Sequence, residues 1–298
     1  MYKHPGVSLG ILFALGTSIT WAVANVFIAN TGKALGAGRA MFWALAVGAV
    51  VAAAVGLALD PGPRDFSASN LGLLGLCVVF GMIANTGIFT AFASGHLLAV
   101  VPIVSGWSLF AAVFATLFLH ERVRPLQVVA ALLVFIGMMV VSTSSARSSG
   151  DGPEPSPGGI TPRRAVFAAF CAAVGFGALL PLLSTLGPAF GEITTSSLLF
   201  LGYTAVGIPL ARVQGRSIAA PPRALWTGVL VAGAAEVAGV AFLVLARRFA
   251  PMTVVGPLSS LASTLTVLYA WIVLRERPPR IVLLGAFLVC VGVVTLAL

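Results

Sequence analysis

The sequence is poor in charged side chains. Of its 298 residues only 8% are charged, with 8 Asp or Glu against 17 Lys or Arg. A soluble globular protein carries roughly a quarter of its residues as charged ones, so this chain has too few to cover a water-facing surface. Hydrophobic residues make up 59% of the chain, and this composition indicates a membrane protein.

Histidine and cysteine are also scarce. The three histidines, His4, His96 and His120, are isolated from one another, without the spacing of metal ligands. The three cysteines lie inside apolar segments and form no CxxC pattern. The chain contains no phosphate-binding Gly-Lys-Ser/Thr loop and no Ser-His-Asp arrangement. We therefore expect that the protein is not an enzyme and binds no metal or other cofactor. Its energy would then come from a gradient, since the chain has no site that would hydrolyse ATP.

The net charge of +9 does not indicate a nucleic-acid partner. The basic residues do not gather on amphipathic faces, as they would in a protein that binds nucleic acid. They fall between the apolar runs, where loop charges set the orientation of a membrane protein.

Ten apolar runs are long enough to cross a bilayer, which takes roughly 20 mostly apolar residues in a helix that satisfies its own backbone hydrogen bonds. The runs are Val7–Ala29, Ala37–Leu59, Asn70–Ala91, Leu97–Phe118, Pro125–Val141, Ala165–Thr185, Thr195–Ala211, Leu225–Ala246, Met252–Leu274 and Pro279–Leu298. Most breaks between them hold turn formers or charges, such as Thr31-Gly32-Lys33. The longest polar stretch, Ser142 to Arg164, is rich in Ser, Gly and Pro and is expected to be a flexible linker.

The two sides of this linker are related in sequence. A shift of 155 residues carries Leu119-His120-Glu121-Arg122 onto Leu274-Arg275-Glu276-Arg277. The same shift aligns Pro102 with Pro257, Ser105 with Ser260, Ser108 with Ser263, Gly137 with Gly292 and Gly32 with Gly187. Residues 1–141 and 165–298 then hold five helices each, and an odd number reverses the second half. The prediction is an all-α polytopic membrane protein with ten transmembrane helices, arranged as a 5+5 inverted repeat.

The repeated segments resemble the two EamA-type repeats of the drug/metabolite transporter superfamily. The Glu-Arg pair between the fourth and fifth helix of each half is the most specific feature, and Arg39 at the start of the second helix also fits, although its counterpart is Thr194. The resemblance implies a ten-helix basket with helices 1, 3, 4, 6, 8 and 9 around a central cavity. It also implies transport, often export, of amino acids or other small metabolites, with both termini in the cytoplasm.

Glu236 is the only acidic residue well inside a predicted span. A charge at that depth costs at least a few kcal/mol, so such residues usually face a cavity or a partner and have a function. Burial favours the neutral carboxyl, which makes Glu236 a candidate proton carrier or a counter-ion for a substrate amine. The alternative is a neutral Glu236 that bonds to a neighbouring helix.

The first helix carries Thr17, Trp21 and Asn25 at intervals of four residues, so they follow one face. A tryptophan ring suits an apolar or cationic group, and an amide both donates and accepts. Packing between helices could equally explain Thr17, because such side chains bond across helices in lipid. With Asn85 and Trp107 in the third and fourth helices, these residues and Glu236 form the predicted substrate site, which would suit an amine with an apolar or aromatic portion.

Pro102 and Pro257 are candidate hinges, because each removes a backbone donor and bends its helix at the same place in the two halves. A fixed bend is the alternative. The pairs Glu121-Arg122 and Glu276-Arg277 are interpreted as structural caps of helical hairpins.

The loop charges conflict over orientation. With a cytoplasmic N-terminus the inner side holds six Lys or Arg, namely Lys3, Arg64, Arg122, Arg124, Arg247 and Arg248. The outer side then holds eleven, namely Lys33, Arg39, Arg147, Arg163, Arg164, Arg212, Arg216, Arg223, Arg275, Arg277 and Arg280. The count disfavours this orientation, whereas early helices often dominate and the resemblance supports it.

The sequence thus predicts a gradient-driven exporter of amino acids or similar small metabolites, working by alternating access in the cell inner membrane. Its partners would be a small-molecule substrate, the lipid bilayer and a proton or other coupling ion, and the protein would be a monomer or weak homodimer. A multidrug or organic-cation exporter is the nearest alternative, although the first helix lacks the acid typical of small multidrug exporters. A membrane-embedded enzyme, a lipid scramblase and a channel are the alternatives outside this class.

Overall fold

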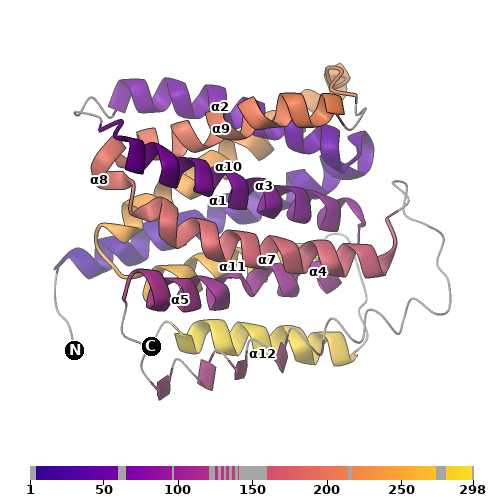
Figure 1. Cartoon of the computed structure of the whole chain (residues 1–298). Helices are drawn as coiled ribbons and strands as arrows, with labels where there is room; N and C mark the ends of the chain where they lie inside the picture. The colour runs from indigo at the N-terminus through magenta and orange to yellow at the C-terminus, as the bar shows by residue number, and fades with distance from the viewer. Residues whose placement is uncertain are drawn as a thin grey trace.

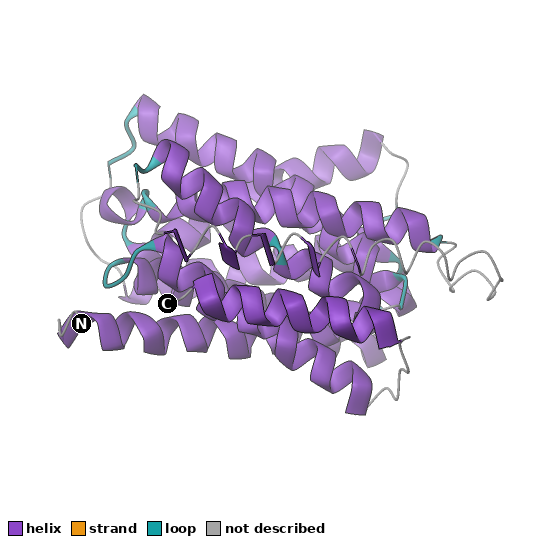
Figure 2. Ribbon diagram, turned by 90° about the horizontal axis from the view of Figure 1, so that it is seen from below, coloured by secondary structure: helices purple, strands orange, loops and turns teal. Residues whose placement is uncertain are grey.

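The chain folds into a bundle of helices that lie along roughly one direction, with the connections gathered at two ends (Figures 1 and 2). The computed structural model describes residues 5–59, 65–95, 97–120, 160–213, 217–272 and 280–296, together with residues 125–126, 129–130, 132–133, 136–137 and 140. Within these ranges the elements are α1 (Pro5–Leu35), α2 (Ala37–Leu59), α3 (Ala68–Ala93), α4 (Leu97–Ser105), α5 (Trp107–Phe118), α7 (Pro162–Ser184), α8 (Gly187–Phe190), α9 (Glu192–Val213), the 3-10 helix η2 (Arg223–Leu225), α10 (Trp226–Arg247), α11 (Met252–Ile272) and α12 (Arg280–Leu296).

Several of these helices are long and apolar enough to cross a membrane. Among the described residues the candidate spans number 7: Ser8–Leu35, Ala37–Gly56, Ala68–Ala93, Ala99–Phe118, Pro162–Ser184, Glu192–Arg212 and Arg223–Arg247. Two shorter apolar stretches, Val254–Thr266 and Leu283–Gly292, lie in α11 and α12. Helices suit lipid because their backbone groups bond within the segment. The protein is therefore a multi-pass membrane protein, and part of the expected fifth run, Pro125–Val141, lies outside the described residues.

Glycine, more than the flanking polar residues, decides where the first helix ends. The predicted break at Thr31-Gly32-Lys33 was wrong, since α1 continues through it to Leu35. The chain turns at Gly36, whose φ of +80° is a left-handed conformation that L side chains rarely adopt. The hydroxyl of Thr31 meanwhile donates to the carbonyl of Phe27 at 2.6 Å, so it bonds within the helix.

The expected fourth helix, Leu97–Phe118, is divided in two. A tight turn at Gly106, whose N–H donates to the carbonyl of Ile103 at 3.1 Å, separates α4 from α5. Pro102 removes one backbone donor from α4, and glycine is a poor helix former, which together weaken this segment. Its counterpart α11 contains Pro257 and continues as one helix.

The same helix pairing occurs twice with the two halves exchanged. The helix α1 packs against α10, where a Cβ added to Gly228 of α10 would lie 2.9 Å from the methyl carbon of Thr31 of α1. The repeat shift of 155 carries α1 onto α7 and α3 onto α10, and α3 packs against α7 just as closely, with Gly87 beside Ala168. Small residues allow this close approach, on which helix association in lipid depends.

The counterparts α1 and α7 run in opposite directions. Near the start of α1, Gly10 lies beside Ala250. At the end of α7, the hydroxyl of Ser184 accepts a hydrogen bond of 3.2 Å from Nε of Arg247. The start of one helix and the end of its counterpart thus lie at the same end of the molecule.

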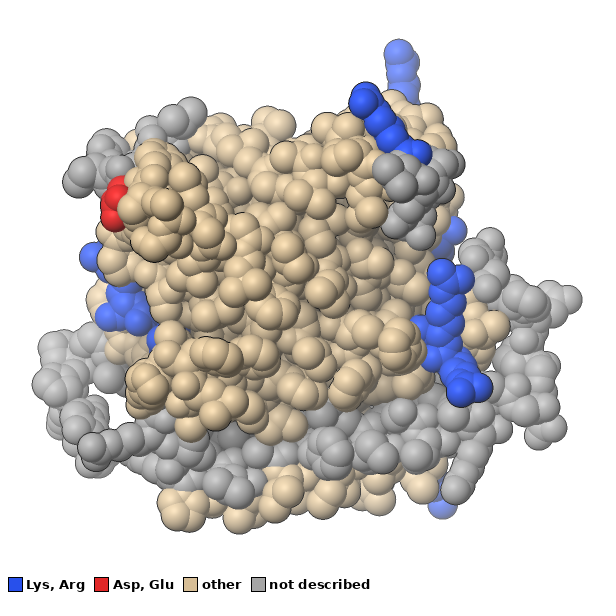
Figure 3. Space-filling model, viewed as in Figure 1, with Lys and Arg blue, Asp and Glu red and all other residues tan. Residues whose placement is uncertain are grey.

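Charged side chains gather at the two ends, and the face shown in Figure 3 has an uncharged belt between them. We name the ends after one residue each. The Arg39 end carries, among the described residues, Lys33, Arg39, Arg163, Arg164, Arg212, Arg223 and Arg280, and the Arg248 end carries Asp65, Glu192, Arg247 and Arg248. Arg248 and Glu192 form an ion pair at 3.0 Å. The first residues of α1 and the last residues of α12 lie toward the Arg248 end (Figure 1), and the two Glu-Arg pairs of the sequence lie outside the described residues.

Arg39 fastens the connection between α9 and α10 to the start of α2. Its guanidinium donates from Nε to the carbonyl of Ala219 at 2.8 Å and from a terminal nitrogen to the carbonyl of Ala220. The indole of Trp43 donates to the same carbonyl of Ala219 at 3.1 Å, and its ring meets that of Trp226 edge to face at 5.2 Å. Trp43 and Trp226 thus lie near the first residues of α2 and α10.

Close packing at glycine can be tested in α3. We expect Gly87→Leu to lower the melting temperature of the purified protein in detergent, because its Cβ would lie 2.5 Å from the carbonyl of Ala168 and 2.8 Å from the nitrogen of Ala172. Overpacking costs typically about 1–3 kcal/mol. Gly75→Leu is the matched control, since nothing lies within 4 Å of its Cβ position. Equal melting temperatures would contradict the α3–α7 contact.

Candidate functional site

A polar cavity lies in the middle of the bundle. It is lined by Trp21, Asn25, Ile88, Val104, Trp107, Phe176, Glu236, Ala262 and Ser263. These residues come from α1, α3, α4, α5, α7, α10 and α11, which are the helices that the family resemblance places around the central cavity. Its volume of about 30 Å³ holds one or two water molecules, so this conformation is closed to a metabolite.

Glu236 presents the acidic group of the cavity. It lies at the middle of α10 with only 6% of its surface exposed. Its carboxyl makes no hydrogen bond and no ion pair with any described residue. An unpaired polar group at this depth is costly, and the sequence alternative of a Glu236 bonded to a neighbouring helix does not occur among these residues.

Two tryptophans form an aromatic corner beside this carboxyl. The rings of Trp21 and Trp107 meet edge to face, with centroids 5.9 Å apart and an interplanar angle of 84°. The indole N–H of Trp21 is buried and has no hydrogen-bond partner within the described structure. Gly239, one turn after Glu236, makes room for this ring, because a Cβ at that position would collide with the indole. The cavity therefore offers a free N–H, a free carboxyl and two aromatic faces.

Asn25 completes the polar lining from α1. Its amide nitrogen donates to the hydroxyl of Thr266 on α11 at 3.1 Å, and that hydroxyl donates to the carbonyl of Ala262 at 2.8 Å. These two hydrogen bonds fix the orientation of the Asn25 amide in the cavity. One hydroxyl of α1 also ties the same two helices together, since Ser18 donates to the carbonyl of Leu258.

Two predicted site residues do not line the cavity. Thr17 is fully buried and donates to the carbonyl of Phe13 within α1 at 3.2 Å. Asn85 donates to the carbonyl of Gly81 within α3 at 2.8 Å. The structure thus brings together Trp21, Asn25, Trp107 and Glu236, while Thr17 and Asn85 bond to their own helices.

The repeat could have identified a residue that the sequence interpretation missed. A shift of 155 residues carries Trp21 onto Phe176, and both rings line the cavity. Sliding the polar stripe of α1 along the repeat would have marked this position on α7. Ser263, the repeat counterpart of Ser108, also lines the cavity and was not among the predicted site residues.

The described residues hold no group of three or more His, Cys, Asp or Glu side chains that could bind a metal ion. The three cysteines are free thiols.

Secondary transporters commonly bind their substrates near the bilayer midplane, and the polar cavity lies among helices that are long enough to cross a membrane. The model of the EamA-like transporter family matches residues 8–143 and 163–298, which together cover nearly the whole chain. The protein belongs to the EamA-like transporter family, a group of membrane transporters in the drug/metabolite transporter superfamily.

The fold is shared with solved structures. One of them, titled "Crystal structure of protein", superposes with a TM-score of 0.67 at 19% identity, over 96% of this chain and 94% of the other. In all, 28 solved chains match. No curated protein matches the sequence.

The contact between the indole ring of Trp21 and Gly239 can be tested by substitution of the glycine. We expect Gly239→Ala to displace the indole, which would change its fluorescence emission and lower the melting temperature of the purified protein. Gly256→Ala is the matched control, since its Cβ would lie 3.7 Å from the ring of Trp107, an ordinary contact. Identical emission spectra for the wild type and Gly239→Ala would contradict the contact.

Proposed function

We propose that the protein is a gradient-driven transporter that exports amino acids or similar small metabolites by alternating access. The observation that carries this proposal is a pair of polar groups in one cavity that have no hydrogen-bond partner among the described residues, the indole N–H of Trp21 and the carboxyl of Glu236. Buried polar groups are normally hydrogen-bonded, so two that converge without a partner are suited to a ligand. In this scheme Glu236 binds a substrate amine or a proton, and the release of one favours the other.

The inverted 5+5 arrangement is part of the same proposal. It is supported by the exchanged pairs α1–α10 and α3–α7, and by the opposite directions of α1 and α7. Two such halves can exchange conformations and expose the cavity alternately to the two sides. Because the cavity is closed, helices must move to admit a substrate, and Pro102 and Pro257 are our proposed hinges in α4 and α11.

An organic-cation exporter is the second candidate. The edge-to-face pair of Trp21 and Trp107 favours it, because aromatic faces attract cations that lack hydrogen-bond donors. A quaternary ammonium probe would bind through these rings, whereas an amino acid would in addition need the hydrogen bonds of Glu236 and Asn25.

The role of Glu236 can be tested by ligand screening. We expect an amine-bearing metabolite, from a panel of amino acids, nucleosides, sugars and organic cations, to raise the melting temperature of the wild type. A ligand at 100 times its Kd stabilises a protein by about 2.7 kcal/mol. Glu236→Gln keeps the side-chain volume and should remove both this shift and the pH dependence of uptake into proteoliposomes.

The result distinguishes the candidates. A shift by organic cations alone would favour the second candidate. Uptake by Glu236→Gln that keeps the wild-type pH dependence would contradict the assignment of Glu236.

We propose that both termini face the cytoplasm and that the protein lies in the cell inner membrane. The family resemblance supports this orientation, while the excess of Lys and Arg at the Arg39 end argues for the reverse. We therefore expect a fluorescent protein fused after Leu298 to be active, and alkaline phosphatase inserted within 142–159 to be active as well. The opposite pattern, with phosphatase active after Leu298, would reverse the orientation.

A further inference from the structure

The two polar groups of the cavity that Glu236 lines need opposite partners. A carboxylate only accepts hydrogen bonds, whereas an indole N–H only donates them. Glu236 therefore needs a donor and the N–H of Trp21 needs an acceptor, and neither has one among the described residues. A ligand that satisfies both groups must carry a donor and an acceptor of its own.

Gly239 determines where the N–H of Trp21 lies. A Cβ at Gly239 would collide with Cδ1 and Nε1, the edge of the indole that carries the N–H. Gly239 follows Glu236 by three residues on α10, so the two positions share one helix face and lie about 4.5 Å apart along the axis. Trp21 and Glu236 both line the cavity, and a small ligand can therefore reach the N–H and the carboxyl at once.

The second half of the chain shows that the scaffold does not require this N–H. A shift of 155 residues carries Trp21 onto Phe176, which keeps an aromatic ring in the cavity and has no N–H. The counterpart of Gly239 is Ala84. One helix pair thus combines an indole with a glycine where the related pair has a phenyl ring and an alanine. The N–H of Trp21 is an addition to the shared scaffold, and it is available for a ligand.

The charge of the cavity limits which acceptor that ligand can carry. The described lining contains Glu236 and no Lys, Arg or His. In the complete sequence the 17 Lys and Arg fall in the connections or in the first and last turns of the apolar runs. A substrate ammonium would pair with Glu236, whereas a carboxylate on the same substrate would lie beside a second negative charge without a cation. A buried charge without a partner is costly.

We propose that the substrates are amines that also carry an uncharged oxygen, such as amino alcohols and the amides or esters of amino acids. The inference rests on the proposed function, in which Glu236 binds the amine, and it narrows the class of substrate. The ammonium donates to the carboxylate of Glu236, and the oxygen accepts from the indole N–H of Trp21. The rings of Trp21, Trp107 and Phe176 contact the apolar or aromatic portion.

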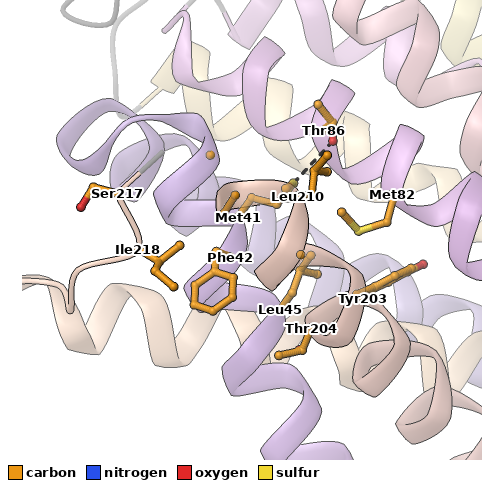
Figure 4. A pocket seen from close by; sticks show the side chains of 13 residues that line it. Met41, Phe42, Leu45, Met82, Thr86, Tyr203, Thr204, Leu210, Ser217 and Ile218 are labelled. Carbon is orange, nitrogen blue, oxygen red and sulfur yellow. Dashed lines mark hydrogen bonds between the residues drawn. The ribbon is translucent and has the colours of Figure 1, made fainter. Parts of the chain in front are cut away.

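A second cavity, of about 70 Å³, lies between α2, α3 and α9 (Figure 4). Apolar side chains such as Met41, Leu45 and Met82 form most of its wall, and its described lining contains no charged residue. It shares no lining residue with the cavity of Glu236. Because it offers an ammonium no counter-ion, this second cavity serves as a control for the site of binding.

Three ligands with the same ring and amine test the proposal. Phenethylamine has no oxygen, phenylalaninol has a hydroxyl, and phenylalanine has a carboxylate. In calorimetric titrations at pH 7 we expect the purified protein to bind phenylalaninol about tenfold more tightly than the other two, because it alone satisfies the N–H without adding a negative charge. Equal affinities, tighter binding of phenylalanine, or no binding of phenylalaninol would overturn the proposal.

The role of the N–H is tested by Trp21→Phe, which keeps a ring and removes the donor. This variant should bind phenylalaninol and phenethylamine with equal affinity. Trp107→Phe is the matched control, since it removes the same atoms from the other ring of the pair, and it should keep the preference. A preference that survives in Trp21→Phe, or that Trp107→Phe loses, would also overturn the proposal.

The location of the site is tested by filling the second cavity. Gly207→Leu should occupy that cavity, since its Cβ would lie 3.6 Å from the ring of Phe42, an ordinary contact. We expect this variant to bind all three ligands as the wild type does. A loss of phenylalaninol binding in Gly207→Leu would place the ligand in the second cavity and overturn the proposal.

The two proposals fail in different ways. Glu236→Gln should weaken the binding of phenethylamine and phenylalaninol alike. Unchanged binding of phenethylamine by Glu236→Gln would show that Glu236 does not bind the amine, which removes its role in the proposed function and this inference with it. Binding that depends on Glu236 but does not distinguish phenylalaninol from phenethylamine removes the substrate class alone.

Discussion

In lipid, helices gain nothing from covering apolar surface, because the acyl chains are as apolar as leucine. The bundle therefore depends on backbones that approach closely enough for many weak contacts to add up. Gly87 against Ala168 and Gly175 against Ala84 bring α3 and α7 together, and Gly233 brings α10 onto α2. Larger side chains at these points would separate the helices that enclose the cavity. The shape of the site is thus set by residues that have almost no side chain.

The two sequence repeats differ at the position of the cavity carboxyl. Both halves supply helices to the centre, yet among the residues that line the cavity the carboxyl is that of Glu236, and the counterpart of Glu236 in the repeat is Gly81. One carboxyl between two related halves carries one charge, and a single charge can be balanced by one proton or one amine. Two carboxyls at that depth would repel each other and share a proton. In the exchange that we propose, one such carboxyl would correspond to one proton or one amine.

Much of the fold could be predicted from hydrophobicity because each span must satisfy its own backbone. The boundaries of α2 agree with the predicted run Ala37–Leu59. Errors arose where a short-range signal was misinterpreted: Thr31 can bond within a helix, so it does not end one, and Gly106 ended α4 inside a run that was apolar throughout. The site was harder, because hydrophobicity does not report where a side chain points. Thr17 lies about 6 Å along the axis from Trp21, which was enough to remove it from the cavity, and Asn85 turned to its own backbone.

The clamp of Arg39 determines which parts of the molecule can move independently. Its guanidinium and the indole of Trp43 hold two consecutive carbonyls of the α9–α10 connection. Lifting that connection from α2 would break three hydrogen bonds at once, so α2 and the adjoining ends of α9 and α10 are mechanically coupled. In the alternating access that we propose, the two halves would then have to move against each other elsewhere, and the turn at Gly106 that divides α4 from α5 lies on the other side of the bundle. In that scheme the bonds of Arg39 and Trp43 would leave the larger movement to the side of the bundle that holds α4 and α5.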